Sequence, residues 1–72
     1  MEVMDFKVRE LVGIAAAVAG HCQSCFEYHL EQARKMSVSE GEIRAAVKIA
    51  QMVRKAGDDN MDKFVQEKLT VK

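Results

Sequence analysis

Two cysteines and a histidine, Cys22, Cys25 and His29, follow one another at intervals of three and four residues. On a helix, which turns about 100° per residue, all three lie within an arc of about 60°. Cys25 and His29 are then one turn apart, close enough for the imidazole to exchange a proton with the thiol. Both cysteines would lie near the helix start, where unpaired N–H groups and the helix dipole favour a thiolate. The spacing predicts a redox-active thiol site.

Glu10 is the residue that could orient or deprotonate His29. If the chain folds into an antiparallel helical hairpin at Gly20, Glu10 lies ten residues before the bend and His29 nine after it. At about 1.5 Å rise per residue, both stand roughly 14–15 Å from the turn. A carboxylate among apolar neighbours is a better base than a solvated one. We therefore expect one seam that carries Glu10, His29, Cys25 and Cys22.

Other interpretations of these residues stay open. The Cys-x-x-Cys-x-x-x-His pattern could supply three ligands to a zinc ion, with His21 or Glu10 as the fourth. The protein would then be a non-catalytic oligomeric module that binds a metal. The two cysteines could also be unreactive core residues. Within the redox interpretation, Cys22 could be the attacking thiol if it is the more accessible one.

The elements that must position these residues are helices, because the chain has no proline and no long alternating apolar pattern. Gly20 and Gly57 are expected to end helices, and Ser39 with Glu42 forms a capping box that starts one. The predicted helices are Met4–Ala19, Cys22–Lys35, Ser39–Ala56 and a last one starting at Asp58, Asp59 or Asn60. The expected fold is all-α, a small bundle of about four helices around a central hairpin.

The length of 72 residues allows one domain, residues 1–72, with a small core. A chain of this size buries only about 60% of the surface that its unfolded form exposes. A disulfide between cysteines three positions apart closes a loop too small to stabilise the fold. The polar sector of the third predicted helix is also narrow. We therefore expect the chain to self-associate.

The charges exclude some functions. Eleven basic and eleven acidic residues are interspersed and give a net charge of zero, which disfavours nucleic acid or a polybasic membrane contact. The longest apolar run, Leu11 to Gly20, is about half of a membrane span. The start of the chain does not resemble a secretory signal, so we expect a cytoplasmic protein. In that reducing compartment a close cysteine pair is catalytic or metal-binding rather than structural.

The chain resembles the alkyl hydroperoxidase D-like branch of the carboxymuconolactone decarboxylase superfamily. The resemblance covers about Val8 to Val53. It lies in Glu10-Leu11-Val12, the Ala-rich stretch that follows, the Cys-x-x-Cys pair, His29-Leu30 and the Ser39-to-Ile43 opening of the next helix. Gln23 and Ser24 stand where some members carry a histidine of the relay. Ser37 stands where a glycine would end the second helix more comfortably.

The resemblance implies a peroxidase or thiol-disulfide oxidoreductase that needs no cofactor beyond a Cys22–Cys25 disulfide. Glu10 and His29 would form a proton relay, Cys25 would attack the hydroperoxide, and Cys22 would resolve the product. A dihydrolipoyl or thioredoxin-like thiol would reduce the disulfide. The resemblance also implies a homotrimer or homohexamer with active sites near subunit contacts, and a decarboxylase-like enzyme on the same fold is the alternative activity.

Overall fold

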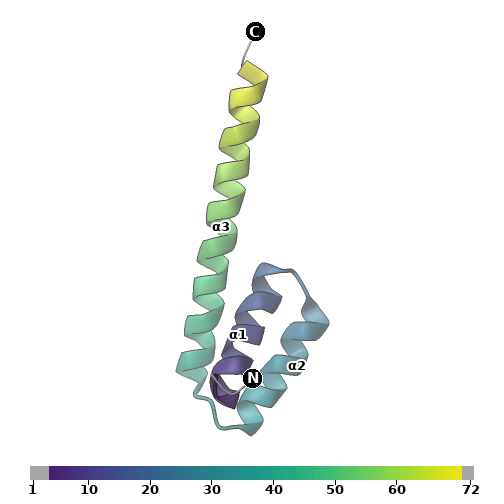
Figure 1. The fold of residues 1–72 in the computed structure, drawn as a ribbon, viewed down its shortest axis with the longest axis vertical. Helices are drawn as coiled ribbons and strands as arrows, with labels where there is room; N and C mark the ends of the chain where they lie inside the picture. The colour runs from purple at the N-terminus through teal and green to yellow at the C-terminus, as the bar shows by residue number, and fades with distance from the viewer. Residues whose placement is uncertain (1–3, 71–72) are drawn as a thin grey trace.

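Three helices make up the protein in the computed structural model, which describes residues 4–70. They are α1 (Phe6–Ala19), α2 (Gln23–Lys35) and α3 (Glu40–Thr70). α1 and α2 form an antiparallel hairpin, and the first half of α3 lies along α1, while the second half extends beyond the hairpin (Figure 1). The all-α fold and the central hairpin are confirmed. The predicted domain, residues 1–72, extends at both ends past the described residues.

The predicted break at Gly57 is wrong, because α3 is one helix of 31 residues that runs through it. No described glycine has a positive φ, so Gly57 does not adopt the left-handed conformation that ends many helices. Lys55 and Asp59, on either side of it, form an i,i+4 ion pair at 3.0 Å. A glycine inside a helix costs about 1 kcal/mol relative to alanine, too little to end a helix by itself.

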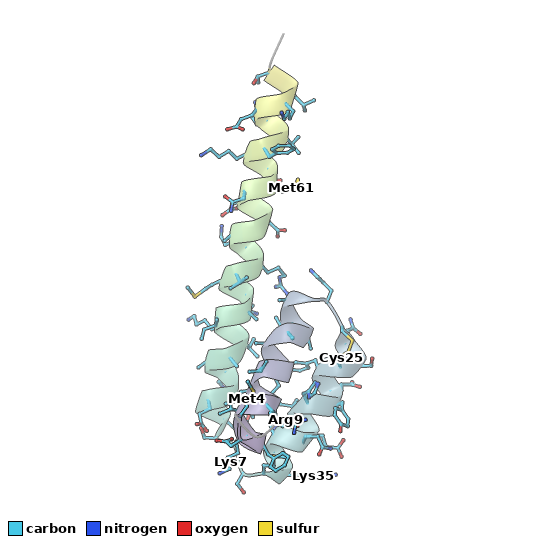
Figure 2. All side chains as sticks on the ribbon, viewed as in Figure 1. Met4, Lys7, Arg9, Cys25, Lys35 and Met61 are labelled. Carbon is cyan, nitrogen blue, oxygen red and sulfur yellow. A yellow bond between two sulfur atoms is a disulfide. The ribbon has the colours of Figure 1, made fainter. Side chains whose placement is uncertain are left out.

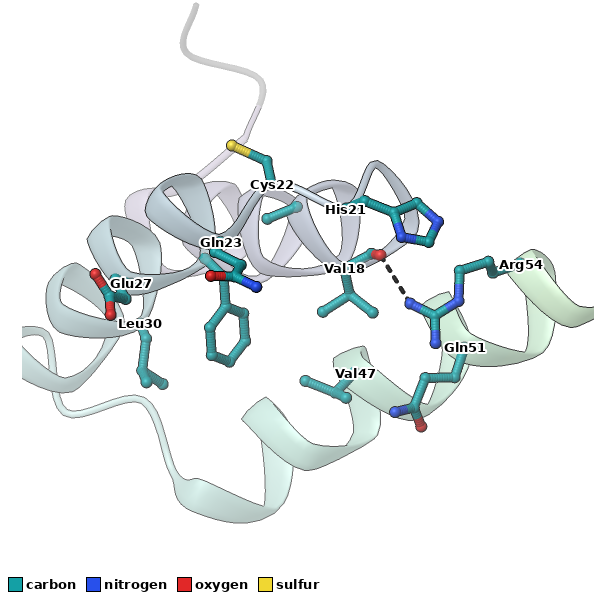
Figure 3. Close-up of a pocket in the computed structure, with 11 residues that line it drawn as sticks. Val18, His21, Cys22, Gln23, Glu27, Leu30, Val47, Gln51 and Arg54 are labelled. Atoms are coloured by element: carbon teal, nitrogen blue, oxygen red, sulfur yellow. Dashed lines mark hydrogen bonds between the residues drawn. The ribbon is translucent and has the colours of Figure 1, made fainter.

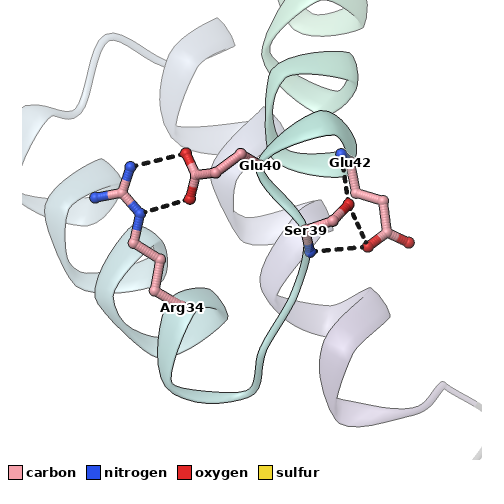
Figure 4. A network of polar contacts seen from close by, with 4 residues as sticks. All are labelled: Arg34, Ser39, Glu40 and Glu42. Atoms are coloured by element: carbon pink, nitrogen blue, oxygen red, sulfur yellow. Dashed lines mark hydrogen bonds and ion pairs between the residues drawn. The ribbon is translucent and has the colours of Figure 1, made fainter.

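Side-chain caps mark the starts of α1 and α3. The side chain of Asp5 accepts a hydrogen bond from the Val8 N–H, so α1 starts two residues later than predicted. The capping box before α3 is confirmed (Figure 4). In it the Glu42 N–H donates to Ser39 Oγ at 3.1 Å, and the Ser39 N–H donates to Glu42 Oε1 at 3.1 Å.

An ion pair joins the end of α2 to the start of α3. The Arg34 guanidinium donates to both carboxylate oxygens of Glu40, at 2.9 and 3.0 Å (Figure 4). These hydrogen bonds lower the pKa of Glu40 below its ordinary value of 4.5. The pair is exposed to solvent, so it orients the connection more than it stabilises the fold.

The core is small and lies where the three helices meet. Ile14 and Ala33 are fully buried, and Val38 and Ile43 are nearly so. Burial of a side chain the size of Ile14 contributes about 1.5–3 kcal/mol. Ala17 and Ala50 are also buried, and their small side chains allow α1 and α3 to approach closely. Among residues 4–70, no helix combines the length and the apolar character needed to cross a membrane.

Candidate redox site

The turn between α1 and α2 fixes the position of Cys22. The His21 N–H donates to the Val18 carbonyl at 3.3 Å, and the Cys22 N–H donates to the Ala17 carbonyl at 2.9 Å. These two bonds form a Schellman motif in which His21, with φ of 59°, takes the left-handed position. Gly20 is the C-cap residue, as predicted, but it has φ of −90°. Cys22 closes the end of α1 with its backbone N–H and is also the N-cap of α2.

The sulfur atoms of Cys22 and Cys25 are joined in a disulfide across the first turn of α2. The Cys25 N–H lies 3.3 Å from Cys22 Sγ, which occupies the place of a capping side-chain oxygen. Ser24 Oγ lies 3.8 Å from the same sulfur. Cys25 is exposed, near the hairpin turn (Figure 2), whereas Cys22 is half-buried.

Glu10 and His29 meet across the hairpin at the level that the sequence predicts. His29 Nδ1 and Glu10 Oε1 are 2.7 Å apart, with Glu10 15% and His29 30% exposed. A carboxylate only accepts hydrogen bonds, so Nδ1 carries the proton in this pair. Nε2 is then the nitrogen that can take a proton from another group. The pair has the composition of a base held in one tautomer by a carboxylate.

Gly13 belongs to this site, although the sequence interpretation did not single it out. A Cβ atom at position 13 would lie 2.6–2.7 Å from three atoms of the His29 ring. The absence of a side chain on α1 therefore allows the imidazole to lie against the helix, three residues from Glu10. The signal in the sequence is an isolated glycine inside a helical apolar stretch, which often has a packing or functional reason.

A hollow of about 630 Å³ opens beside Cys22, between α2 and α3 (Figure 3). Its walls include the apolar side chains of Phe26, Leu30 and Val47, and His21 lies at its rim among the lining residues. At one end, the Arg54 guanidinium donates to the Val18 carbonyl at 3.0 Å and so satisfies the C-terminal end of α1.

The lining of this hollow distinguishes the two cysteines. It includes Cys22, but it does not include Cys25, His29 or Glu10. The Glu10–His29 pair therefore lies outside the hollow. His21, which the sequence offered as a possible fourth zinc ligand, lies in the turn directly before Cys22. Within residues 4–70, no three histidine, cysteine or carboxylate side chains are grouped as metal ligands.

What the geometry offers chemically is a disulfide that can be opened to two thiols, with a histidine–carboxylate pair on the same hairpin. Among known proteins, the family model described as "Carboxymuconolactone decarboxylase family" matches residues 2–58. The match takes in α1, α2 and the first half of α3, and so all the residues of the site. No curated protein and no solved structure shows a significant match. The chain belongs to the carboxymuconolactone decarboxylase family.

Proposed function

We propose that the protein is a small thiol-dependent peroxidase or disulfide oxidoreductase. The observation that carries the proposal is the Glu10–His29 pair at 2.7 Å, with His29 on the same helix as a Cys22–Cys25 disulfide. A disulfide alone is compatible with an inert pair. A histidine that a carboxylate holds in one tautomer, one turn from a cysteine, is what the activation of a thiol requires.

In the proposed first half-reaction, His29 Nε2 takes the proton of the Cys25 thiol and Glu10 stabilises the imidazolium. The Cys25 thiolate attacks the OH oxygen of a hydroperoxide ROOH, so that an S–O bond forms and the O–O bond breaks. The alcohol leaves with the proton from His29, and Cys25 becomes a sulfenic acid. Cys22 then attacks the Cys25 sulfur, the S–O bond breaks, and water leaves as the disulfide forms.

The second half-reaction restores the thiols. An external dithiol attacks the disulfide, passes through a mixed disulfide and leaves oxidised, which returns two electrons and two protons to Cys22 and Cys25. A dihydrolipoyl group or a thioredoxin-like protein has this chemistry. Such donors work in reducing compartments, which supports the cytoplasm as the proposed location. A homotrimer or homohexamer remains our expectation for the assembly.

The roles of the two sulfurs follow from their surroundings. Cys25 is exposed and one turn from His29, which favours Cys25 as the thiol that meets the peroxide. Cys22 is half-buried, and its sulfur accepts the N–H of Cys25, which favours it as the resolving partner and as a good leaving group.

Peroxide consumption with a dithiol donor tests the proposal. Cys25→Ser should abolish turnover, whereas Cys22→Ser should leave Cys25 able to form a trappable sulfenic acid. Glu10→Gln and His29→Gln should each slow turnover by about 10²–10⁴-fold, the range of general acid–base catalysis. Glu31→Gln, a matched change at an exposed position of α2, should leave turnover unchanged.

Three results would contradict the proposed function or the roles of its residues. Sulfenic acid on Cys22 in the Cys25→Ser variant would reverse the two roles. Full turnover in Glu10→Gln and His29→Gln would remove the relay. If wild-type protein consumes no hydroperoxide and exchanges no disulfide, the thiol chemistry is wrong, and a decarboxylase-like activity independent of Cys25 becomes the better candidate.

A further inference from the structure

The hollow between α2 and α3 is set apart from the disulfide. Cys22 is among its lining residues, but the sulfur of Cys22 is directed away from it (Figure 3). Cys25, His29 and Glu10 do not line it. The disulfide and the hollow therefore lie on different sides of the start of α2. The volume of about 630 Å³ is within the range of small-molecule sites, about 300–1,000 Å³.

The hollow is mainly apolar and follows the first half of α3. α1 contributes Val18 to its walls, α2 contributes Phe26 and Leu30, and α3 contributes Val47. On α3 the lining runs from Val47 to Arg54, seven residues apart, which is about 10 Å at 1.5 Å rise per residue. An extended hydrocarbon chain of about eight carbons has this length, since a C–C bond is about 1.5 Å long.

Hydrogen-bond donors gather at one end of the hollow. Figure 3 shows the Arg54 guanidinium there, between the side chains of His21 and Gln51. One N–H of Arg54 donates to the Val18 carbonyl at 3.0 Å, and a guanidinium has five such donors. Among residues 4–70, no carboxylate forms an ion pair with this guanidinium. The apolar hollow thus ends on a positive charge that the described part of the chain does not neutralise.

The negative charge in the lining lies away from Arg54. Glu27 is the one acidic residue among the described residues that line the hollow, and Figure 3 shows it beside Leu30, at the other end. An anionic group in the hollow is therefore attracted to the Arg54 end and repelled from the Glu27 end. This fixes the direction of a bound molecule, with its anionic group at Arg54 and its apolar body toward Leu30.

We propose that the hollow binds a small amphiphile that has one carboxylate and a chain of about eight carbons. The Arg54 guanidinium donates two parallel N–H bonds to the carboxylate, and the chain packs on Val18 and Val47. One guanidinium balances the single charge of a carboxylate, whereas a phosphate monoester carries about −1.5 to −2. The proposal does not depend on the thiol chemistry proposed above.

Calorimetric titration of the purified protein with sodium octanoate tests the proposal. We expect saturable binding of one octanoate per chain. Hexanoate and butyrate should bind more weakly, by about two- to fourfold for each methylene removed, because each methylene gives up apolar surface that the walls bury. Amide chemical shifts should change at Val18, Val47 and Arg54 on binding and stay constant at the exposed Glu31.

Charge variants test the place of the carboxylate, with 1-octanol as a ligand of the same chain length and no charge. Arg54→Gln should weaken octanoate binding about tenfold and leave 1-octanol binding unchanged. Gln51→Glu should have the same effect, because the new carboxylate competes for Arg54, and it retains the hydrogen bond from Arg54 to Val18. Arg44→Gln removes a guanidinium at an exposed position of α3 outside the hollow. It should leave both affinities unchanged.

Several results would overturn the proposal. One is the absence of saturable octanoate binding, and another is chemical shift changes confined to residues outside the hollow. Equal weakening of octanoate binding by Arg44→Gln and Arg54→Gln, or an unchanged octanoate affinity in Gln51→Glu, would overturn the placement of the carboxylate at Arg54. Peroxide turnover is not used in these measurements, so a failure here is distinguishable from a failure of the proposed function.

Discussion

At position 13 a hydrogen atom in place of a side chain decides how closely His29 approaches α1. The Glu10–His29 contact requires that the imidazole lie against the α1 backbone, and a Cβ at position 13 would lie 2.6 Å from its Nδ1. That nitrogen is the one that binds Glu10. Side chains cannot share this space, so any other residue at position 13 must move the ring. Gly13 therefore positions the pair without touching a substrate.

We predict that Gly13→Ala breaks the Glu10–His29 pair. In an open helix interior, glycine to alanine raises stability by about 0.5–1 kcal/mol, and Gly57→Ala should do so because nothing lies within 4 Å of the new Cβ. Gly13→Ala should fail to stabilise and should slow peroxide turnover as much as Glu10→Gln does. Urea unfolding and imidazole ¹⁵N shifts, which report the His29 tautomer, provide the measurements. An unchanged tautomer and a gain in stability equal to that of Gly57→Ala would contradict the prediction.

Much of the candidate site could be predicted from sequence because helical geometry alone relates its residues. The rise per residue puts Glu10 level with His29 once the chain turns at Gly20, and the spacing of Cys22 and Cys25 puts their sulfurs in one turn. The role of Gly13 could not be predicted in the same way. It depends on the distance between two helix axes, which side-chain packing sets and sequence spacing does not.

At the scale of the elements, two helices end on a left-handed residue that is not glycine. Ser37 has φ of 63°, and its N–H and that of Val38 close a Schellman motif on Arg34 and Ala33. Val38 is 5% exposed and packs in the core with Ala33. The hydrophobic residue after the turn therefore holds this helix end, although the residue in the turn itself disfavours the conformation.

This also explains why the break at Gly57 was predicted wrongly. The residue that follows Gly57 is Asp58, and a carboxylate cannot close a turn by packing on the core. Glycine permits a helix end but does not impose one, whereas an apolar residue placed to pack back on the helix does. The all-α class and the first two helices could be predicted because the capping residues and the apolar residues indicate the same helix ends. At Gly57 the glycine indicates a helix end, but no apolar residue follows it to close the turn.

We predict that Ser37→Gly stabilises the protein by about 0.5–1 kcal/mol, because glycine adopts the left-handed conformation without the steric cost that serine bears. Ala45→Gly, at an exposed helical position of α3, should instead destabilise it by about 1 kcal/mol. Thermal unfolding of both variants beside wild type is the measurement. Equal destabilisation by the two changes would show that the turn at Ser37 does not carry this cost.

The whole molecule is elongated for its length. Its radius of gyration is 16.0 Å, and its longest dimension is 56 Å against 23 and 21 Å for the others. A compact chain of 72 residues would have a radius of gyration of about 11 Å. The excess comes from the second half of α3, which leaves the hairpin (Figure 1). One chain is thus a folded unit of two and a half helices with a helical arm.

We predict that amide hydrogen exchange divides α3 near Lys55. At high dilution, amides from Asp58 to Thr70 should exchange nearly as fast as an unfolded chain, because a helical segment without tertiary contacts is marginal in water. Amides beside the buried Ile43 and Ala50 should be protected by the full stability of the core. If copies of the chain associate through the arm, protection should grow in the arm alone as the concentration rises.

Met61→Asp should remove the concentration dependence and leave the protection at Ile43 unchanged. An arm that is as protected as the core at every dilution would mean that contacts within one chain hold it. The elongated shape would then be a property of the folded monomer and no sign of a second copy.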